Sequence, residues 1–163
     1  MTILGIDPGT ATMGFGVVRK DNGKLIHVDH GAIRTSKDDH QAVRLVQLYD
    51  GVEELIRKYK PVAISVEKLF FSANSNTAMT VGEARGVVLL AAAKNSLPIY
   101  EYTPLQIKMA ITGYGRAEKR QIQEMVKLIL KLETFPKPDD AADGLAIAIC
   151  HINSFNPNLP NIK

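Results

Sequence analysis

The sequence predicts an α/β fold in which a mixed five-stranded sheet is flanked by helices. Three observations predict it. Apolar runs of strand length, separated by turn residues, fill the first part of the chain. Apolar residues at helical spacing follow, and each later strand comes directly after such a helix. A sheet that begins with antiparallel strands and continues with parallel crossovers, covered by helices, accounts for this order.

The first part of the chain predicts three antiparallel strands. Thr2–Asp7 is an apolar run that ends on a carboxylate and is followed by the turn residues Pro8-Gly9. Residues 14–20 carry β-type side chains, and Asp21-Asn22-Gly23 is a hairpin turn. Lys24–Arg34 is therefore expected to be the third strand.

The remainder predicts helices that alternate with two further strands. A helix with apolar residues from Leu45 to Tyr59 ends before Pro61. The other expected elements are a strand at 62–66, a helix at 77–95, a strand at 98–102, helices at 104–111 and 118–132, and a final helix that Asp139 or Asp140 caps and that ends near Ser154. Residues 1–155 are expected to form one domain, and the Asn/Pro-rich tail, 156–163, is expected to fray.

Composition limits the classes of function. The 163 residues carry 20 Lys and Arg against 17 Asp and Glu, a net charge of +3 that permits a polyanionic partner without requiring one. Basic residues gather between 108 and 131, a pattern that a solvated helix face would also explain. Cys150 is the only cysteine, so no intrachain disulfide is possible. No apolar run approaches ~20 residues and the N-terminus has no leader pattern, which predicts a cytoplasmic protein that is not bound to a membrane.

Four acidic residues are placed where a site would form. Asp7 and Glu67 each stand at the carboxyl end of a predicted buried strand, and the two side chains converge if those strands are neighbours. Asp140 and Asp143 lie three residues apart at the start of a helix, so they share one face. Taken singly, each acid could also cap a turn or a helix. Their combination favours a common site.

Carboxylates gathered in one place predict a metal site. Like charges raise one another's pKa unless a cation joins them. A ligand set made only of oxygen atoms suits Mg²⁺ or Mn²⁺ and argues against zinc. Two such ions can activate water and stabilise the leaving oxygen of a phosphodiester, which predicts a metal-dependent nuclease.

Another interpretation starts from Asp7-Pro8-Gly9-Thr10. An acid, a glycine and a hydroxyl after a first strand and before a hairpin also open the actin-like ATPases. Those proteins need a second, adenosine-binding half, for which we expect no room in 163 residues.

Five segments in order resemble the RuvC Holliday junction resolvases, from Ile3 to about His151. They are Ile3-Leu4-Gly5-Ile6-Asp7-Pro8-Gly9, Val66-Glu67-Lys68-Leu69-Phe70, Glu83-Ala84-Arg85-Gly86, Ala117-Glu118-Lys119 and Asp140-Ala141-Ala142-Asp143-Gly144-Leu145-Ala146. The resemblance implies a ribonuclease-H-like fold, a homodimer, and paired symmetric Mg²⁺-dependent cuts across a four-way DNA junction in recombination and repair. It also suggests a branch-migration motor, RuvA–RuvB, as a partner.

The resemblance assigns roles to individual residues. It implies that Asp7, Glu67, Asp140 and Asp143 bind two metal ions and catalyse cleavage, with Mn²⁺ able to replace Mg²⁺. Lys108 and Lys119 stand at positions that the family uses near the scissile backbone, and Arg116, in the same basic stretch, is expected to bind DNA. Phe70 matches an aromatic that stacks on a junction base, although Phe71 beside it could take that role. A glycine pair of the family corresponds to Gly113 and Gly115 around Tyr114, and the small residues of helix 77–95 suit the dimer contact.

Two rival functions stay open from the sequence. One is a ribonuclease-H-like nuclease that acts on RNA, and the other is a junction-binding protein without catalysis. The intact set of four acids counts against the second rival, because binding alone gains nothing from buried like charges. The four histidines share no spacing, and we assign them no role.

Overall fold

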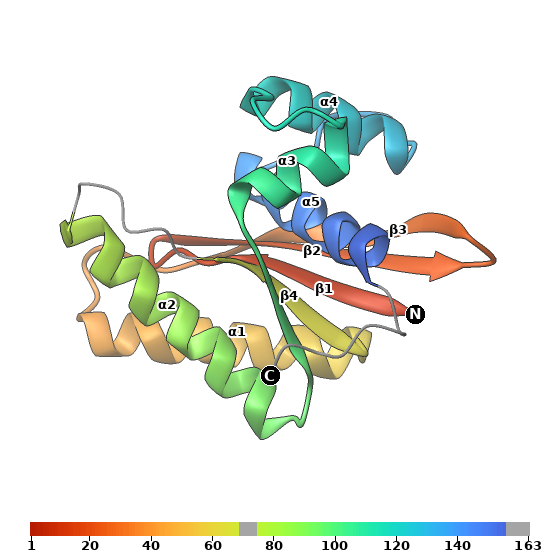
Figure 1. Ribbon diagram of the computed structural model, residues 1–163. Helices are drawn as coiled ribbons and strands as arrows, with labels where there is room; N and C mark the ends of the chain where they lie inside the picture. The colour runs from red at the N-terminus through yellow and green to blue at the C-terminus, as the bar shows by residue number, and fades with distance from the viewer. Residues whose placement is uncertain (69–74, 156–163) are drawn as a thin grey trace.

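The computed structural model describes residues 1–68 and 75–155, without the side chains of 75–77, and arranges them as a sheet with helices on both faces (Figure 1). The elements in chain order are β1 (Thr2–Asp7), β2 (Thr12–Asp21), β3 (Lys24–Arg34), α1 (Gln41–Tyr59), β4 (Ala63–Glu67), α2 (Ser75–Lys94), β5 (Ile99–Tyr102), α3 (Pro104–Thr112), α4 (Lys119–Ile129) and α5 (Asp139–Ser154). The predicted fold class is confirmed.

The sheet places the ends of β1 and β4 side by side. Its strand order is β3-β2-β1-β4-β5. The pairs β1–β2 and β2–β3 are antiparallel, whereas β4 lies parallel to both β1 and β5. Ile6 is the register partner of Val66. The residues that follow them, Asp7 and Glu67, therefore lie at the same edge of the sheet.

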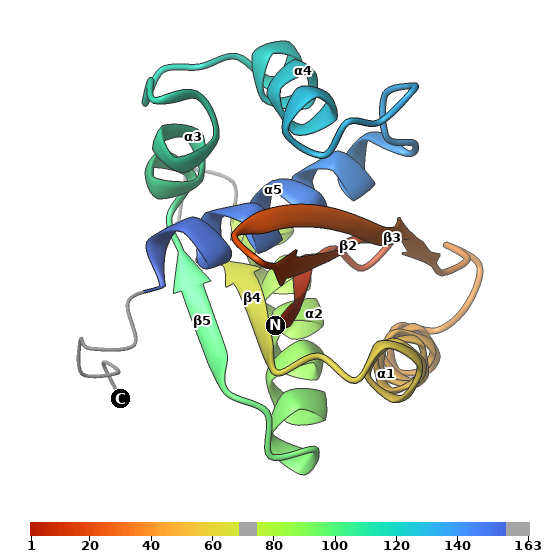
Figure 2. The same ribbon diagram turned by 90° about the vertical axis from the view of Figure 1, so that its right-hand side faces the viewer.

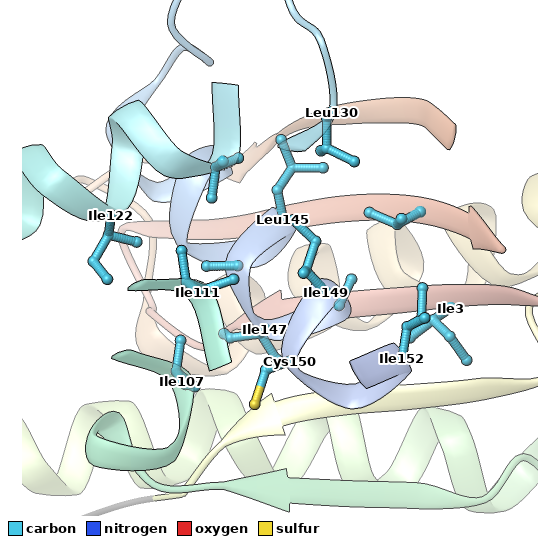
Figure 3. Packing of buried hydrophobic residues seen from close by; sticks show 14 of the residues in the cluster. Ile3, Ile107, Ile111, Ile122, Leu130, Leu145, Ile147, Ile149, Cys150 and Ile152 are labelled. Atoms are coloured by element: carbon cyan, nitrogen blue, oxygen red, sulfur yellow. The ribbon is translucent and has the colours of Figure 1, made fainter. Parts of the chain in front are cut away.

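Each face of the sheet has its own core. Ile3 and Val18 point to the face covered by α3, α4 and α5, whereas their neighbours Leu4 and Val17 point to the face covered by α1 and α2 (Figures 1 and 2). This alternation follows from the two-residue period of a strand. Figure 3 shows the first core, where the isoleucines of α5 extend from Ile107 and Ile111 of α3 at one end to Ile3 of β1 at the other. Both cores are fully buried at their centres, which fixes α5 on the sheet.

Glycines let the backbone of α5 rest directly on β1 and β2. A Cβ atom at Gly5 would lie 2.2 Å from the carbonyl oxygen of Gly144, and a Cβ at Gly14 would lie 2.0 Å from that of Asp140. A Cβ at Gly16 would lie 2.4 Å from the amide nitrogen of Leu145. Gly14 is also the register partner of Asp7. Asp140 therefore packs on Gly14, the residue of β2 that pairs with Asp7.

Two predicted helix boundaries are wrong. Pro138, in an extended conformation, occupies the N-cap of α5, and it makes no side-chain cap bond. Neither Asp139 nor Asp140 is therefore the cap, and both lie in the first helical turn. The predicted helix 118–132 is shorter in the structure because Lys131 adopts a positive φ of 53° and the N–H of Leu132 turns back to the carbonyl of Lys127.

No helix built from the described residues combines the length and the apolar character that crossing a membrane requires.

Candidate active site

Three carboxylates meet above the edge of the sheet. Asp7, Asp140 and Asp143 each offer an oxygen atom, and these atoms all lie within 4.8 Å of one another. Asp7 comes from the end of β1, and the other two come from the first turns of α5, whose backbone the glycine contact holds in place. The three side chains are half-buried, so a cation could reach them from solvent.

Glu67 joins this group through a cavity of about 240 Å³. The carboxylates in its lining are Asp7, Glu67 and Asp143, and the other lining residues are Pro104, Ile107, Lys108, Lys119, Ile122, Ala146 and Ile147. Glu67 stands outside the three-oxygen cluster, and Asp140 stands outside the cavity lining. The four acids therefore form two overlapping groups that share Asp7 and Asp143.

Burial and mutual repulsion disfavour charge on these acids. Burial, followed by the charges of Asp143, Glu67 and Asp140, raises the pKa of Asp7 to about 7. The pKa of Glu67 is also raised, mainly by burial and then by Asp143. Burial raises the pKa of Asp143 as well, although Lys119 opposes that rise. The site is therefore prepared to accept positive charge.

Two lysines lie at the walls of the cavity. The Lys119 ammonium donates to Oδ2 of Asp143 over 2.9 Å, and this bond raises the pKa of Lys119. Lys119 begins α4 and its side chain is 54% exposed, so it can also reach toward solvent. Lys108 projects from α3, and its charge lowers the pKa of Glu67. The acids thus stand between two cations that do not fully neutralise them.

The remaining sequence-based expectations lie around this centre. Arg116 is exposed on the segment between α3 and α4. Gly113 ends α3 with a positive φ of 71°, which a glycine adopts without strain. Phe70 and Phe71 lie outside the described residues. The structure therefore places Arg116 near the start of α4 and leaves the stacking aromatic as a prediction.

His151, to which the sequence assigned no role, anchors the strand end beside Glu67. Tyr102 is the register partner of Glu67, and its carbonyl accepts from the N–H of Lys68 over 2.8 Å. The Tyr102 hydroxyl is 2.7 Å from Nδ1 of His151, a buried residue of α5 whose pKa burial lowers to about 4. This contact fastens the end of β5 to the helix that carries Asp140 and Asp143. No spacing in the sequence links residues 102 and 151.

A second anchor holds the turn that follows Asp7. The Thr10 hydroxyl donates to the carbonyl of Thr80 in α2 over 2.8 Å, and the carbonyl of Thr10 accepts from the Thr35 hydroxyl over 2.7 Å. Arg44 of α1 in turn donates to the Thr35 hydroxyl. The turn beside Asp7 is therefore tied to both helices on the opposite face of the sheet.

The donor set fits a hard divalent cation. All four candidate ligands are carboxylates, which are the groups that Mg²⁺ and Mn²⁺ prefer. Histidine and cysteine, which would favour zinc, are absent from the described lining of the cavity. The raised pKa of Asp7 is consistent with such a site, because a bound cation would offset both the burial of its charge and the repulsion from the neighbouring carboxylates.

Comparisons with known proteins identify similar chains. The model of the family described as "Crossover junction endodeoxyribonuclease RuvC" matches residues 3–151. A protein of that name from Rubrobacter xylanophilus is 62% identical over 91% of this chain and 83% of its own length. Another from Caldanaerobacter subterraneus is 52% identical over 96% of this chain and 94% of its own.

Solved structures resemble the fold. RuvC from Thermus thermophilus, in complex with a Holliday junction substrate, superposes with a TM-score of 0.88 at 37% identity and covers 93% of both chains. The yeast mitochondrial Holliday junction resolvase Ydc2 superposes with a TM-score of 0.64 over 93% of this chain and 78% of its own. Its 16% identity supports the fold alone.

We predict that removing the charge of Asp7 stabilises the metal-free protein at pH 8. The pKa of Asp7 is about 7 in the folded protein, above the ordinary aspartate pKa of 3.8. The contribution of Asp7 to the free energy of unfolding is therefore fully present below about pH 4 and is lost as the pH rises through 7. In EDTA at pH 8, Asp7→Asn should raise the free energy of unfolding by roughly 2–4 kcal/mol, and by much less at pH 4. Urea unfolding measures this difference.

Added Mg²⁺ should reverse the order of the two proteins at pH 8, because only the wild type keeps the full ligand set. Asp50→Asn, at an exposed acid on α1, is the matched control and should change little at either pH. Equal stabilities of wild type and Asp7→Asn at pH 8 would contradict the electrostatic account.

Proposed function

The chain belongs to the RuvC family of crossover junction endodeoxyribonucleases, and we propose that it resolves Holliday junctions by metal-dependent phosphodiester hydrolysis in homologous recombination and DNA repair. The observation that carries this proposal is the convergence of four carboxylates and two lysines from five separate elements, in the lining of one cavity or, for Asp140, beside the lining residues Asp7 and Asp143. Such an arrangement suits a polyanionic substrate that is cut with the help of cations. Residues 1–155 would form one ribonuclease-H-like nuclease domain.

We assign the four acids to two ions of Mg²⁺, which Mn²⁺ could replace. Asp7 and Asp143 belong to both overlapping groups, so they would contribute to both ions, whereas Glu67 would hold one ion and Asp140 the other. Bound divalent cations lower the pKa of coordinated water and stabilise charge on a leaving oxygen. The carboxylates would hold and orient the ions, and the apolar wall of Ile107 and Ile122 would limit the access of bulk water.

The lysines would meet the phosphates. A cation on Asp143 competes with the Lys119 ammonium, so metal binding would release Lys119 toward a substrate phosphate. Lys108, which also lines the cavity, would stabilise negative charge near Glu67. Arg116 would add a backbone contact outside the cavity. From the family pattern, Phe70 or its neighbour Phe71 would stack on a base at the junction.

We further propose a homodimer joined through α2. Met79 and Leu90 are 71% and 54% exposed, and they lie on one helix face because eleven residues span about three turns. Gly86 lies on the same face, and a Cβ built there would meet no atom within 4 Å. The opposite face, with Ala84 and Val88, is buried against the sheet. A symmetric dimer would present two sites to one junction, as paired cuts require.

The cellular setting is proposed from family membership. The protein would act in the cytoplasm, with a RuvA–RuvB branch-migration motor as its partner and no membrane attachment. Copurification of the three cognate proteins on a four-way junction would test the partnership.

Asp7→Asn is expected to reduce nicking of a mobile four-way junction in Mg²⁺ by at least about a thousandfold, because a ligand shared by both ions is lost. Junction affinity should change little, since the phosphate contacts remain. Gel assays with mapped cut positions give the cleavage rate, and Asp50→Asn is the control. Preferential cutting of an RNA–DNA hybrid by the wild type in a competition assay would contradict the assigned substrate, and absence of nicking would contradict catalysis.

Lys119→Ala should slow cleavage by about a hundredfold. It should also reduce the slope of log affinity against log salt concentration by about one, which corresponds to the loss of one phosphate contact. Lys24→Ala, at the hairpin turn on the other end of the sheet, should leave both quantities unchanged. If Lys119→Ala kept the wild-type rate and salt slope, Lys119 would be only a partner of Asp143.

Met79→Glu should raise the dissociation constant of the dimer by at least about tenfold, because the substitution would bury a charge in an apolar contact. Sedimentation equilibrium measures the shift. Val46→Glu, which changes a 58% exposed apolar residue on α1, is the matched control. A dimer that tolerates Met79→Glu would rule out this face of α2.

A further inference from the structure

An apolar surface lies exposed on α3 and the turn after it. Leu105, Met109 and Tyr114 are 60%, 50% and 56% exposed, although large apolar side chains gain free energy from burial. Leu105 and Met109 are four residues apart, so they lie one above the other on the same helix face. We call these three residues the α3 platform. Neither core of the fold includes them.

The α3 platform is continuous with the wall of the active-site cavity. Pro104 and Lys108 line that cavity, and Leu105 and Met109 are the residues that directly follow them. The turn folds back onto the same surface, since a Cβ at Gly115 would lie 2.4 Å from Cδ1 of Leu105. The same helix therefore carries both a wall of the cavity and the platform, so a strand bound in the cavity can extend onto the platform.

The backbone beneath Tyr114 is held in place while its ring remains in solvent. The Thr112 hydroxyl accepts from the N–H of Tyr114 over 3.1 Å and lies 3.0 Å from the Tyr114 carbonyl and 2.8 Å from that of Lys108, to which it can donate. Gly113 ends the helix with its N–H bonded to the carbonyl of Met109. An aromatic ring on a preorganised turn can bind a flat partner with little loss of conformational entropy.

The charged residues near the α3 platform indicate which class of partner it binds. Lys108, Arg116 and Lys119 lie close to the platform along the chain, and Glu118 is the one acid between residues 105 and 120. Glu118 is the N-cap of α4, where its N–H donates to Oε1 of Gln121 over 2.8 Å. An apolar, aromatic surface with a basic rim suits a single nucleic-acid strand, whose bases and sugars are apolar on their faces and whose backbone is anionic.

We propose that the α3 platform binds the DNA strand next to the scissile phosphate, with Tyr114 stacked on a base or sugar and Leu105 and Met109 packed against the adjacent deoxyribose. This inference rests on the proposed nuclease function and extends it. Tyr114 is then a specificity-determining residue for the cleavage position, because stacking strength and strand flexibility depend on the bases that reach its ring. Lys108 and Arg116 hold the backbone on either side of it.

The test compares Tyr114→Ala, Tyr114→Phe and the control Leu128→Ala, which removes a 69% exposed apolar side chain from α4. Each protein is titrated in EDTA against a set of four-way junctions that each carry 2-aminopurine at a different position near the crossover, and cleavage in Mg²⁺ is then followed. For Tyr114→Ala we expect loss of the fluorescence quench, about tenfold weaker junction binding, and cuts spread over more positions. Tyr114→Phe and Leu128→Ala should behave as wild type.

The outcomes separate this inference from the proposed function. A wild type that quenches but does not cut would remove the nuclease function and keep the platform. Unchanged affinity, quench and cut positions in Tyr114→Ala, with an active wild type, would overturn the platform. A changed sedimentation coefficient with unchanged junction affinity would assign the surface to a contact between two copies of the chain, which also overturns the proposal. Equal thermal unfolding midpoints of all variants verify that each one folds.

Discussion

Repulsion among the four carboxylates is a free-energy cost that the packing of this fold has to overcome. Four acids cannot be held together in a half-buried place without a free-energy cost, and burial together with this repulsion raises the pKa of Asp7 to about 7. The fold meets it with two buried cores that fix β1, β4 and α5 in place. The cost also makes the site selective, because the arrangement becomes favourable only when positive charge arrives, from lysines or from divalent cations.

The anchors around the acids differ in kind. Close backbone packing through glycines sets α5, whereas hydrogen bonds set the strand ends through Tyr102 and Thr10. Backbone packing resists displacement in every direction, and hydrogen bonds fix orientation at little cost in space. Together they hold ligands from distant parts of the chain within a few ångströms. A catalytic centre of this type needs such precision, because its geometry and not a reactive side chain does the chemistry.

Sequence patterns predicted the parts of the molecule that depend on local rules. Strand ends and helical spacing located Asp7, Glu67 and the pair Asp140 and Asp143. The prediction that Asp7 and Glu67 converge depended on their strands being neighbours, and β1 and β4 are neighbours in the sheet. What depended on contacts between distant residues was not predictable. The contact of His151 with Tyr102 joins residues 49 apart, and Pro138 displaced the acids from the cap because an extended proline fits that position. Asp140, and not its neighbour Asp139, belongs to the carboxylate cluster. The packing of Asp140 on Gly14 places it there.

The same packing has a consequence for variation within the family. Gly5, Gly14, Gly16 and Gly144 face backbone atoms that cannot move aside, so even a methyl group at these positions would force α5 off the sheet. A mutational scan would therefore find them as intolerant as the acids, although a glycine has no side chain with which to bind a metal or DNA. If these glycines are invariant across homologues, the reason would be the close packing of α5 on the sheet. An assignment of catalytic residues from invariance alone would wrongly include them.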